Sequence, residues 1–508
     1  MTAVTDPQAV TPPPAAAAHP PIHETLDDRT RWLAFLTILL AQFMNLIDVT
    51  IVNVALPSLQ AGLGASESQI EWVVAGFILV FALGLLPMGR YGDIVGRKRL
   101  FLIGVAAFTV ASLLCGLSPS IEFLVASRLI QGAAGAVMMP QVMAIAQTLF
   151  PPRARAGAFA LFGLTAGLAS VTGPILGGTL INADFFGMGW RPIFLINLPV
   201  GIFTLLAAWR LLPDLPGNPK LRNDWGGIAI IALAMLALIF PLVEGRSFGW
   251  PVWTFVLMAA SVPLFIGFVL WEARQNRRNM PQVMPLSLLK AWNFAVGGLM
   301  SMIYFSAMPA FFLVLALFLQ LGFGFDPQRS GFATVPFPVG VLLGSILSGR
   351  LGARWQRERI IAGLVVLFIG IFWLRTVVLG IGTEVDHWTL LPPLFMAGVG
   401  LAVSISPLFQ TILAGVPVQD AGAGSGALQA IQQAGGALGV AIVSQIFFST
   451  LASSMAEGTA RNEAFVEAMS TAMLYNLAAY VLVGIGALLL KAPQYGDERP
   501  VAPMPVGD

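Results

Sequence analysis

Charged side chains are scarce in this 508-residue chain, in which Asp, Glu, Lys and Arg together make up only 10% of the residues. A soluble domain normally carries about 25% charged residues. Hydrophobic residues reach 57%, and the mean hydropathy is +0.82. This composition excludes an ordinary soluble domain and indicates a membrane protein. The net charge of +2 is spread over many short loops, so no nucleic-acid partner is expected.

Cysteine and histidine are also nearly missing. The single cysteine, Cys115, lies in an apolar stretch, which excludes an intrachain disulfide. The three histidines, His19, His23 and His387, fall outside the apolar stretches without the spacing of metal ligands, so neither a metal nor a cofactor is expected. The chain has no phosphate-binding loop and no cluster of nucleophile and base. These absences argue against direct use of ATP and against a membrane enzyme.

Residues 1–31 are rich in Pro and Ala, which predicts a disordered tail. They lack a basic segment followed by a short apolar core and a cleavage site, so no signal peptide is expected. After this tail, windows of about twenty residues, the length that crosses a hydrocarbon core of about 30 Å, identify fourteen apolar spans. We place these spans at 32–56, 70–88, 100–117, 122–147, 156–181, 192–212, 226–243, 252–271, 291–319, 331–349, 360–380, 389–414, 422–449 and 469–490.

The basic residues test this count independently. Of the 27 Lys and Arg residues, 21 fall on the side of the termini, counting Arg210 at the inner end of the sixth span, and four fall in loops on the other side. Two, Arg128 and Arg375, lie well within spans. Such an imbalance follows the positive-inside rule. Both termini are therefore predicted to be cytoplasmic, in a multi-pass protein of the cytoplasmic (inner) membrane.

A short basic loop punctuated by glycine connects the second and third spans. Its characteristic residues are Gly89, Asp93, Gly96 and Arg97. A connection this tight holds two membrane helices as a hairpin, and the glycines allow another helix to pack closely. Asp93 lies among several cations, so we expect it to have a partner. A second copy of the pattern begins about 260 residues later, at Gly349, and has Ala353 in place of the acid.

The loop resembles the signature between helices 2 and 3 of the major facilitator superfamily of secondary transporters, in which six-helix repeats are typical. Four further segments resemble signatures of its fourteen-span drug:proton antiporters: 46–57, 128–135, 167–178 and 190–199. The resemblance covers about residues 32–490. It implies an all-α polytopic membrane protein with two six-helix bundles related by pseudo-twofold symmetry, plus two inserted helices. The expected division is tail 1–31, bundle 32–212, inserted pair 213–290, bundle 291–490 and cytoplasmic tail 491–508.

Asp48 is the only carboxylate that we place well within a span. An ionisable group at membrane depth is costly and marks a candidate functional site. Burial disfavours its charged form and so favours proton uptake. Gln42, Asn45 and Asn53 fall with Asp48 within an arc of about 140° on a helix, so this polar stripe should face a cavity. The hypothesis is that Asp48 couples transport to protons; the alternative is a structural role shared with Asn53.

Arg128 is the second ion within a span, and its guanidinium stays charged in practice. The hypothesis is that Arg128 senses or tunes the protonation of a nearby acid, for which Asp48 is the candidate. The alternative is a structural ion pair.

Two structural features are expected to control the opening and closing of the transport pathway. Asp93 suits the positive N-terminal end of the helix that begins near Gly422, where it would latch the cytoplasmic gate. In the fifth span, the small residues allow close helix packing and the proline permits a kink. These residues are Gly173, Pro174, Gly177 and Gly178. The resemblance implies a seal against proton leak there, and generic packing is the alternative.

Amide side chains are the candidate polar groups of a substrate cavity: Gln42, Asn45, Gln131, Gln320, Gln410 and Gln433. Among Phe, Met and Trp side chains, they suit bulky apolar or cationic compounds. The expected function is export of drug-like or amphiphilic small molecules by proton antiport. An importer of a specific metabolite with the same fold is the alternative, against which the fifth-span motif argues. The resemblance leaves open a periplasmic adaptor protein as a partner.

Overall fold

The computed structural model describes residues 26–491, except 152–153, 219–220, 246–247, 352–354 and 383. Most of the two predicted tails therefore lies outside the described residues, as does Ala353 of the second loop pattern. Fourteen helices of the described part are long and apolar enough to cross a membrane, which confirms the predicted number of spans. The only strand-like feature described is an isolated bridge between Gly96 and Pro216.

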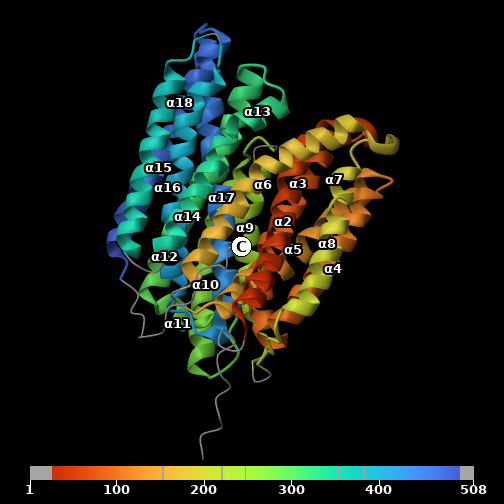
Figure 1. The fold of residues 1–508 in the computed structure, drawn as a ribbon, viewed down its shortest axis with the longest axis vertical. Coiled ribbons are helices and arrows are strands. Elements are labelled where there is room, and N and C mark those ends of the chain that lie inside the picture. Colours follow the sequence, from red (N-terminus) through yellow and green to blue (C-terminus); the bar gives the residue numbers. More distant parts are fainter. Residues whose placement is uncertain are drawn as a thin grey trace, which may run out of the picture.

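The long helices run roughly side by side along the molecule, with short helices at their ends (Figure 1). The helices of the first bundle are α2 (Asp28–Leu63), α3 (Glu67–Val95), α4 (Arg97–Gly116), α5 (Ile121–Leu149), α6 (Arg155–Ala183), α7 (Pro192–Leu195) and α8 (Asn197–Leu211). The next are α9 (Trp225–Glu244), α10 (Val252–Arg277) and α11 (Leu286–Lys290). The second bundle contains α12 (Trp292–Leu317), α13 (Pro327–Thr334), α14 (Pro336–Leu351), α15 (Gln356–Leu379), α16 (His387–Leu413), α17 (Ala421–Ala456) and α18 (Arg461–Leu489). Three short helical segments, η1 (Phe185–Gly187), η2 (Phe318–Gly322) and η3 (Val418–Asp420), complete the set.

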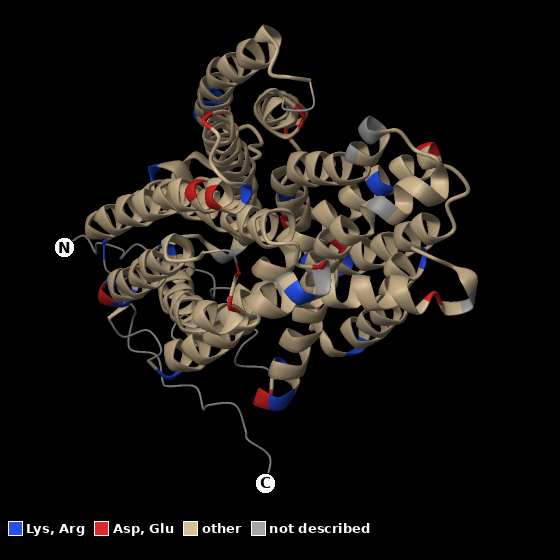
Figure 2. Ribbon diagram, turned by 90° about the horizontal axis from the view of Figure 1, so that it is seen from above, with Lys and Arg blue, Asp and Glu red and all other residues tan. Residues whose placement is uncertain are grey.

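The two bundles lie beside each other, the first coloured red to yellow and the second green to blue in Figure 1. Helices α9 and α10 pack against each other, and α9 also contacts α3 and α17, so the inserted pair touches both bundles. Charged residues are sparse throughout (Figure 2). In the following, the lower end of the molecule is the end with α11 in Figure 1, and the upper end is the end with α13.

Side-chain caps fix the helix starts at the upper end. Ser66 accepts a hydrogen bond from Gln69 N, and the Gln69 side chain accepts one from Ser66 N, which forms a capping box at the start of α3. Asp326 accepts a hydrogen bond from Arg329 N at the start of α13, where a proline takes the first helical position. These caps satisfy backbone N–H groups that have no partner within their own helix.

The inserted pair also contains a fully buried carboxylate. Glu272 is fully buried in α10, and its Oε1 accepts hydrogen bonds from the backbone N of Val283 (3.0 Å) and of Met284 (3.4 Å). Asp224 caps α9 and accepts a hydrogen bond from Trp271 Nε1 at 2.8 Å, which ties the two inserted helices together. Glu272 lies one residue past the predicted limit at 271, and the sequence analysis did not include it because α10 continues six residues beyond that limit.

Candidate functional site

Asp48 is completely buried in α2, where its carboxylate meets three donors from two other helices. Arg128 Nη1 lies 2.5 Å from Oδ2, while Gln131 Nε2 and Asn197 Nδ2 lie 2.8 Å and 2.9 Å from Oδ1. Because all three groups donate to it, the arrangement suits the ionised carboxylate. The structure therefore brings together Asp48 and Arg128, the two residues that the sequence analysis paired.

Arg128 is itself fully enclosed, with 1% of its surface exposed. Its Nε donates to the carbonyl oxygen of Val73 at 3.0 Å, and its Nη1 also donates to Gln131 Oε1 at 2.7 Å. The ring of Phe77 covers the guanidinium, with the ring centroid 4.4 Å from Cζ, which is a cation–π contact. Both charges of the pair thus have partners in the membrane interior, as burial of an ion requires.

Ser112, Cys115 and Asn197 complete this polar cluster, and the sequence analysis missed their part in it. Ser112 Oγ accepts hydrogen bonds from Gln131 Nε2 at 2.8 Å and from Asn197 Nδ2 at 3.2 Å. Cys115 Sγ donates to Gln131 Oε1 at 3.4 Å. These contacts orient the two amides that hold Asp48. Asn197 stands in the 190–199 motif, which was the one available signal.

Asn53 lies apart from this cluster, contrary to the alternative that paired it with Asp48. Its side chain is exposed, and Nδ2 donates to the carbonyl oxygen of Val49 in its own helix at 3.3 Å. The polar stripe of α2 is therefore shorter than the helical arc predicted.

A cavity of about 560 Å³ lies between the bundles. Its lining comes from α2, α3, α5 and α6 of the first bundle, α12, α14, α16 and α17 of the second, and α9 of the inserted pair. Gln42, Asn45 and Gln433 are among the lining residues, together with Gln429 and Gln432 from the same face of α17.

Three predicted cavity residues do not line this space. Gln131 belongs to the Asp48 cluster. Gln410 is buried in α16, where its Oε1 accepts a hydrogen bond from Gln356 Nε2 at 3.0 Å. Gln320 lies half-buried in η2 near the upper end. The expectation was wrong for these residues because residue type alone does not reveal which face of a membrane helix meets the cavity.

Asp93 joins the two bundles at the lower end. It is 4% exposed, and its two oxygens accept hydrogen bonds from the backbone N of Gly422 and of Ala423, both at 2.9 Å. Arg97 Nη2 lies 3.0 Å from Oδ1. The predicted contact between Asp93 and the N-terminus of the helix near Gly422 is confirmed.

Close backbone contact and a second ion pair accompany this link. A Cβ added to Gly89 would lie 2.3 Å from the carbonyl oxygen of Gly422, so α3 and α17 can cross here only without a side chain. Arg90 Nη1 lies 2.8 Å from Asp420 Oδ1, just before α17. Gly96 has φ of 110° between α3 and α4, a conformation that favours glycine. The lower end is thus closed by α3 and α17.

The glycines of α6 differ in what they contact. A Cβ on Gly173 would lie 1.9 Å from Thr50 Oγ1, and one on Gly177 would lie 3.0 Å from Ile51 Cγ1, so both allow α6 to approach α2. Pro174 lies within α6, and a Cβ on Gly331 of the second bundle would lie 3.9 Å from it. Gly178 has open space around it, so it does not serve close packing in this structure.

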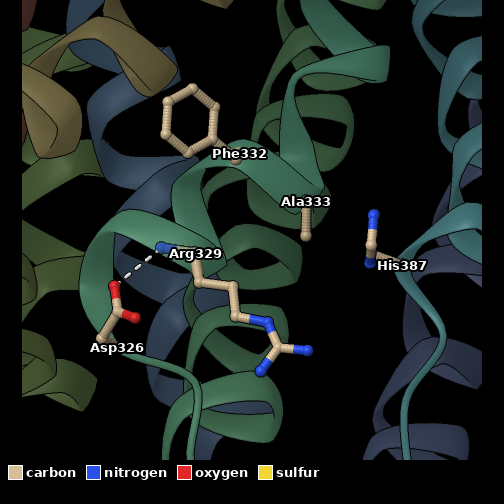
Figure 3. A pocket seen from close by; sticks show the side chains of 5 residues that line it. All are labelled: Asp326, Arg329, Phe332, Ala333 and His387. Carbon is tan, nitrogen blue, oxygen red and sulfur yellow. Dashed lines mark hydrogen bonds between the residues drawn. The ribbon is translucent and has the colours of Figure 1, made fainter.

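A smaller open pocket of about 280 Å³ lies at the upper end between α13 and the start of α16. Figure 3 shows its lining residues Asp326, Arg329, Phe332, Ala333 and His387, with Arg329 N donating to Asp326. None of them belongs to the Asp48 cluster or to the central cavity, so this pocket is separate from the candidate site.

Comparison with known proteins shows the family of the chain. The model of the Major Facilitator Superfamily matches residues 38–440. A probable actinorhodin transporter from Streptomyces coelicolor is 41% identical over 87% of this chain and 76% of its own length. The tetracenomycin C resistance and export protein of Streptomyces glaucescens is 30% identical over 86% of this chain and 79% of its own length.

A solved structure supports the fold. The human organic anion transporter MFSD10 superposes with a TM-score of 0.62 at 17% sequence identity, covering 89% of this chain and 99% of that chain. At this level of identity the likeness concerns the fold alone.

Proposed function

The chain belongs to the major facilitator superfamily, and we propose that it exports drug-like or amphiphilic small molecules across the cytoplasmic membrane by proton antiport. The named relatives support this proposal, since one is described as a probable actinorhodin transporter and another as a tetracenomycin C resistance and export protein. The largely apolar cavity between the bundles supports a bulky substrate.

The observation that carries the proton part of the proposal is the buried cluster around Asp48. Protonation of Asp48 would neutralise the partner of Arg128 and place an O–H donor on one of the two oxygens. The hydrogen bonds from Arg128, Gln131 and Asn197 would then lose their charged acceptor and become weaker. Proton binding therefore favours a different packing of α2 against α5 and α8.

The cavity lies close enough to respond to that change. Gln42 and Asn45 line the cavity from the same helix as Asp48, one to two turns away. Phe77 lines the cavity and also covers the guanidinium of Arg128. A shift of the ion pair would consequently move cavity walls, which is how proton binding and substrate binding exclude each other in this proposal.

The closed lower end defines the conformational state of this structure. The distribution of Lys and Arg supports a cytoplasmic lower end, which the link from Asp93 to Gly422 and Ala423 would seal. We therefore assign the structure to a state closed toward the cytoplasm. Release of this link would expose the cavity to cytoplasmic substrate.

Transport in proteoliposomes tests the proposal. The lumen is made acidic, potassium with valinomycin holds the membrane potential at zero, and an uncharged and a permanently cationic fluorescent dye are assayed in turn. An antiporter moves substrate into the acidic lumen whichever way it is inserted. The wild type is expected to accumulate dye, and Asp48→Asn is expected to lose gradient-driven accumulation.

The matched control is Asp214→Asn, which makes the same chemical change at a side chain that is 95% exposed. Size-exclusion profiles show whether both variants are folded. If Asp48→Asn accumulates as much dye as the control, Asp48 does not couple transport to protons. If dye movement by the wild type does not depend on the pH gradient, proton antiport is refuted.

A further inference from the structure

We propose that the central cavity binds uncharged, flat aromatic compounds that carry both hydrogen-bond donors and acceptors, in preference to organic cations. This inference rests on the proposed function, because it takes the cavity between the bundles as the substrate site. It narrows the expected substrates, which the sequence analysis had left as bulky apolar or cationic compounds.

The first observation is the absence of a counter-ion. None of the described residues that line the cavity is Asp, Glu, Lys, Arg or His. The nearby carboxylate of Asp48 is fully buried, and its oxygens already accept hydrogen bonds from Arg128, Gln131 and Asn197. An organic cation in the cavity would therefore lose hydration without gaining an ionic partner, which is costly.

The ion pair behind this wall offers no counter-ion either. Phe77 lines the cavity, and its ring covers the guanidinium of Arg128 with 4.4 Å between the ring centroid and Cζ. Because Arg128 is paired with Asp48, the two residues together present no net negative charge to a cation.

The second observation is a set of buried amide atoms without a protein partner. Gln42 Oε1 is an acceptor, while Asn45 Nδ2 and Gln432 Nε2 are donors, and all three side chains line the cavity. Their side chains are 7%, 2% and 9% exposed. The three amide atoms are themselves almost inaccessible, so the side chains must rotate before a ligand can reach them. An unpaired buried polar group is costly, so a ligand that offers both a donor and an acceptor favours this rotation by pairing them.

The third observation is the shape of the aromatic walls. In the first bundle, Phe77 and Phe81 stack with an interplanar angle of 12° at 5.8 Å. In the second, Phe305 and Phe409 stack at 14° and 6.1 Å. All four line the cavity. Flat rings pack well against such faces, and the volume falls within the range of about 300–1,000 Å³ that is typical of sites for drug-sized ligands.

Binding to the purified full-length protein in detergent, without any pH gradient, tests the inference. The probes share one three-ring skeleton: 2-(hydroxymethyl)anthraquinone, its trimethylammoniomethyl analogue, and 2-ethylanthracene, which lacks oxygen. Equilibrium dialysis is expected to show the hydroxymethyl compound binding at least about tenfold more tightly than the cation, because the cation leaves its charge unpaired. It is expected to bind more tightly than the hydrocarbon as well.

Three variants assign the effect to the cavity. Gln432→Leu is expected to weaken binding of the hydroxymethyl compound about tenfold and to leave binding of the hydrocarbon unchanged. The substitution removes a hydrogen-bond donor and keeps the side-chain volume. Gln432→Glu is expected to improve binding of the cation by supplying a counter-ion. Gln320→Leu is the matched control, since Gln320 lies outside the cavity.

Equal or tighter binding of the cation by the wild type would overturn the inference, and so would no binding of either anthraquinone. Neither result would touch the proposal of proton antiport, which the vesicle assay tests separately. Conversely, selective binding of the neutral compound with no gradient-driven transport would support the inference and refute proton antiport.

Discussion

Asp48 and Arg128 form an ion pair in the buried interior of the first bundle, where an unpaired charge costs the most free energy. Arg128 makes hydrogen bonds to Asp48, Gln131 and the carbonyl oxygen of Val73, and both members of the pair are essentially inaccessible. Loss of one member leaves the other charged and buried, whereas loss of both leaves neutral groups of similar shape. The pair can therefore be tested by its energetic coupling, independently of transport.

A double-mutant cycle measures that coupling. Arg128→Gln alone is expected to lower the free energy of unfolding by about 3–5 kcal/mol, because it leaves the Asp48 carboxylate without its charged partner. Adding Asp48→Asn is expected to recover much of this loss. Thermal and denaturant unfolding in detergent provide the measurement. Strictly additive effects of the two substitutions would show that the carboxylate and the guanidinium do not interact energetically.

The sequence could predict these two residues but not their full surroundings. An acid and a base within apolar spans stand out by residue type. Asn197 donates to Asp48 across 149 positions of sequence, and no helical periodicity relates residues so far apart. Gln131 was assigned to the cavity because its amide resembles those of Gln42 and Asn45. Its actual place among Asp48, Arg128 and Ser112 depends on the packing of separate helices.

At the scale of the elements, α6 packs closely against α2 because glycines without side chains lie at the contact. Thr50 Oγ1 lies where a Cβ of Gly173 would be and donates to the carbonyl oxygen of Ala169 at 3.1 Å. Gly178, in the same motif, has free space around it. The two glycines look alike in the sequence, and only the structure separates their roles.

Gly173 and Gly178 provide a matched comparison. Gly173→Ala is expected to lower the free energy of unfolding by about 1–3 kcal/mol, because the new methyl group overfills the α2–α6 contact. Gly178→Ala is expected to change it by no more than about 0.5 kcal/mol, because nothing lies within reach. Unfolding in detergent compares the two variants with the wild type. Equal effects would mean that α6 is not packed against α2 as described.

Helix ends show where hydropathy alone misleads. The apolar windows predicted a span at 252–271, yet α10 runs from Val252 to Arg277. A span predicted from hydropathy ends where charged residues begin. A helix continues beyond that point as long as its backbone and side chains find hydrogen-bond partners. Glu272 was lost from the predicted set for this reason, although Val283 N and Met284 N pair with its carboxylate inside the protein. Span number was predictable, because it needs only the alternation of long apolar stretches and short loops.

For the whole molecule, the closed lower end depends on one bundle more than on the other. In the first bundle, Asp93 reaches the N-terminus of α17. At the corresponding place of the second pattern the sequence has Ala353, which has no carboxylate to offer. Arg359, the last cation of this second pattern, donates to the carbonyl oxygen and the Oγ of Ser348 in its own bundle. The link that opens and closes this end is therefore expected to be the one made by Asp93.

Asp93→Asn tests this link through the distance between the two bundles. Spin labels at Tyr91→Cys on α3 and Gly415→Cys before α17 occupy exposed positions, and the native Cys115 is buried. Hydrogen bonds to a charged acceptor contribute about 1.5–3 kcal/mol each, and about 1.4 kcal/mol changes an equilibrium tenfold. Pulsed electron paramagnetic resonance is therefore expected to show a longer distance that is populated at least about tenfold more than in the unsubstituted background. Asp214→Asn serves as the control, and the same distance distribution for both variants would show that Asp93 does not hold the lower end closed.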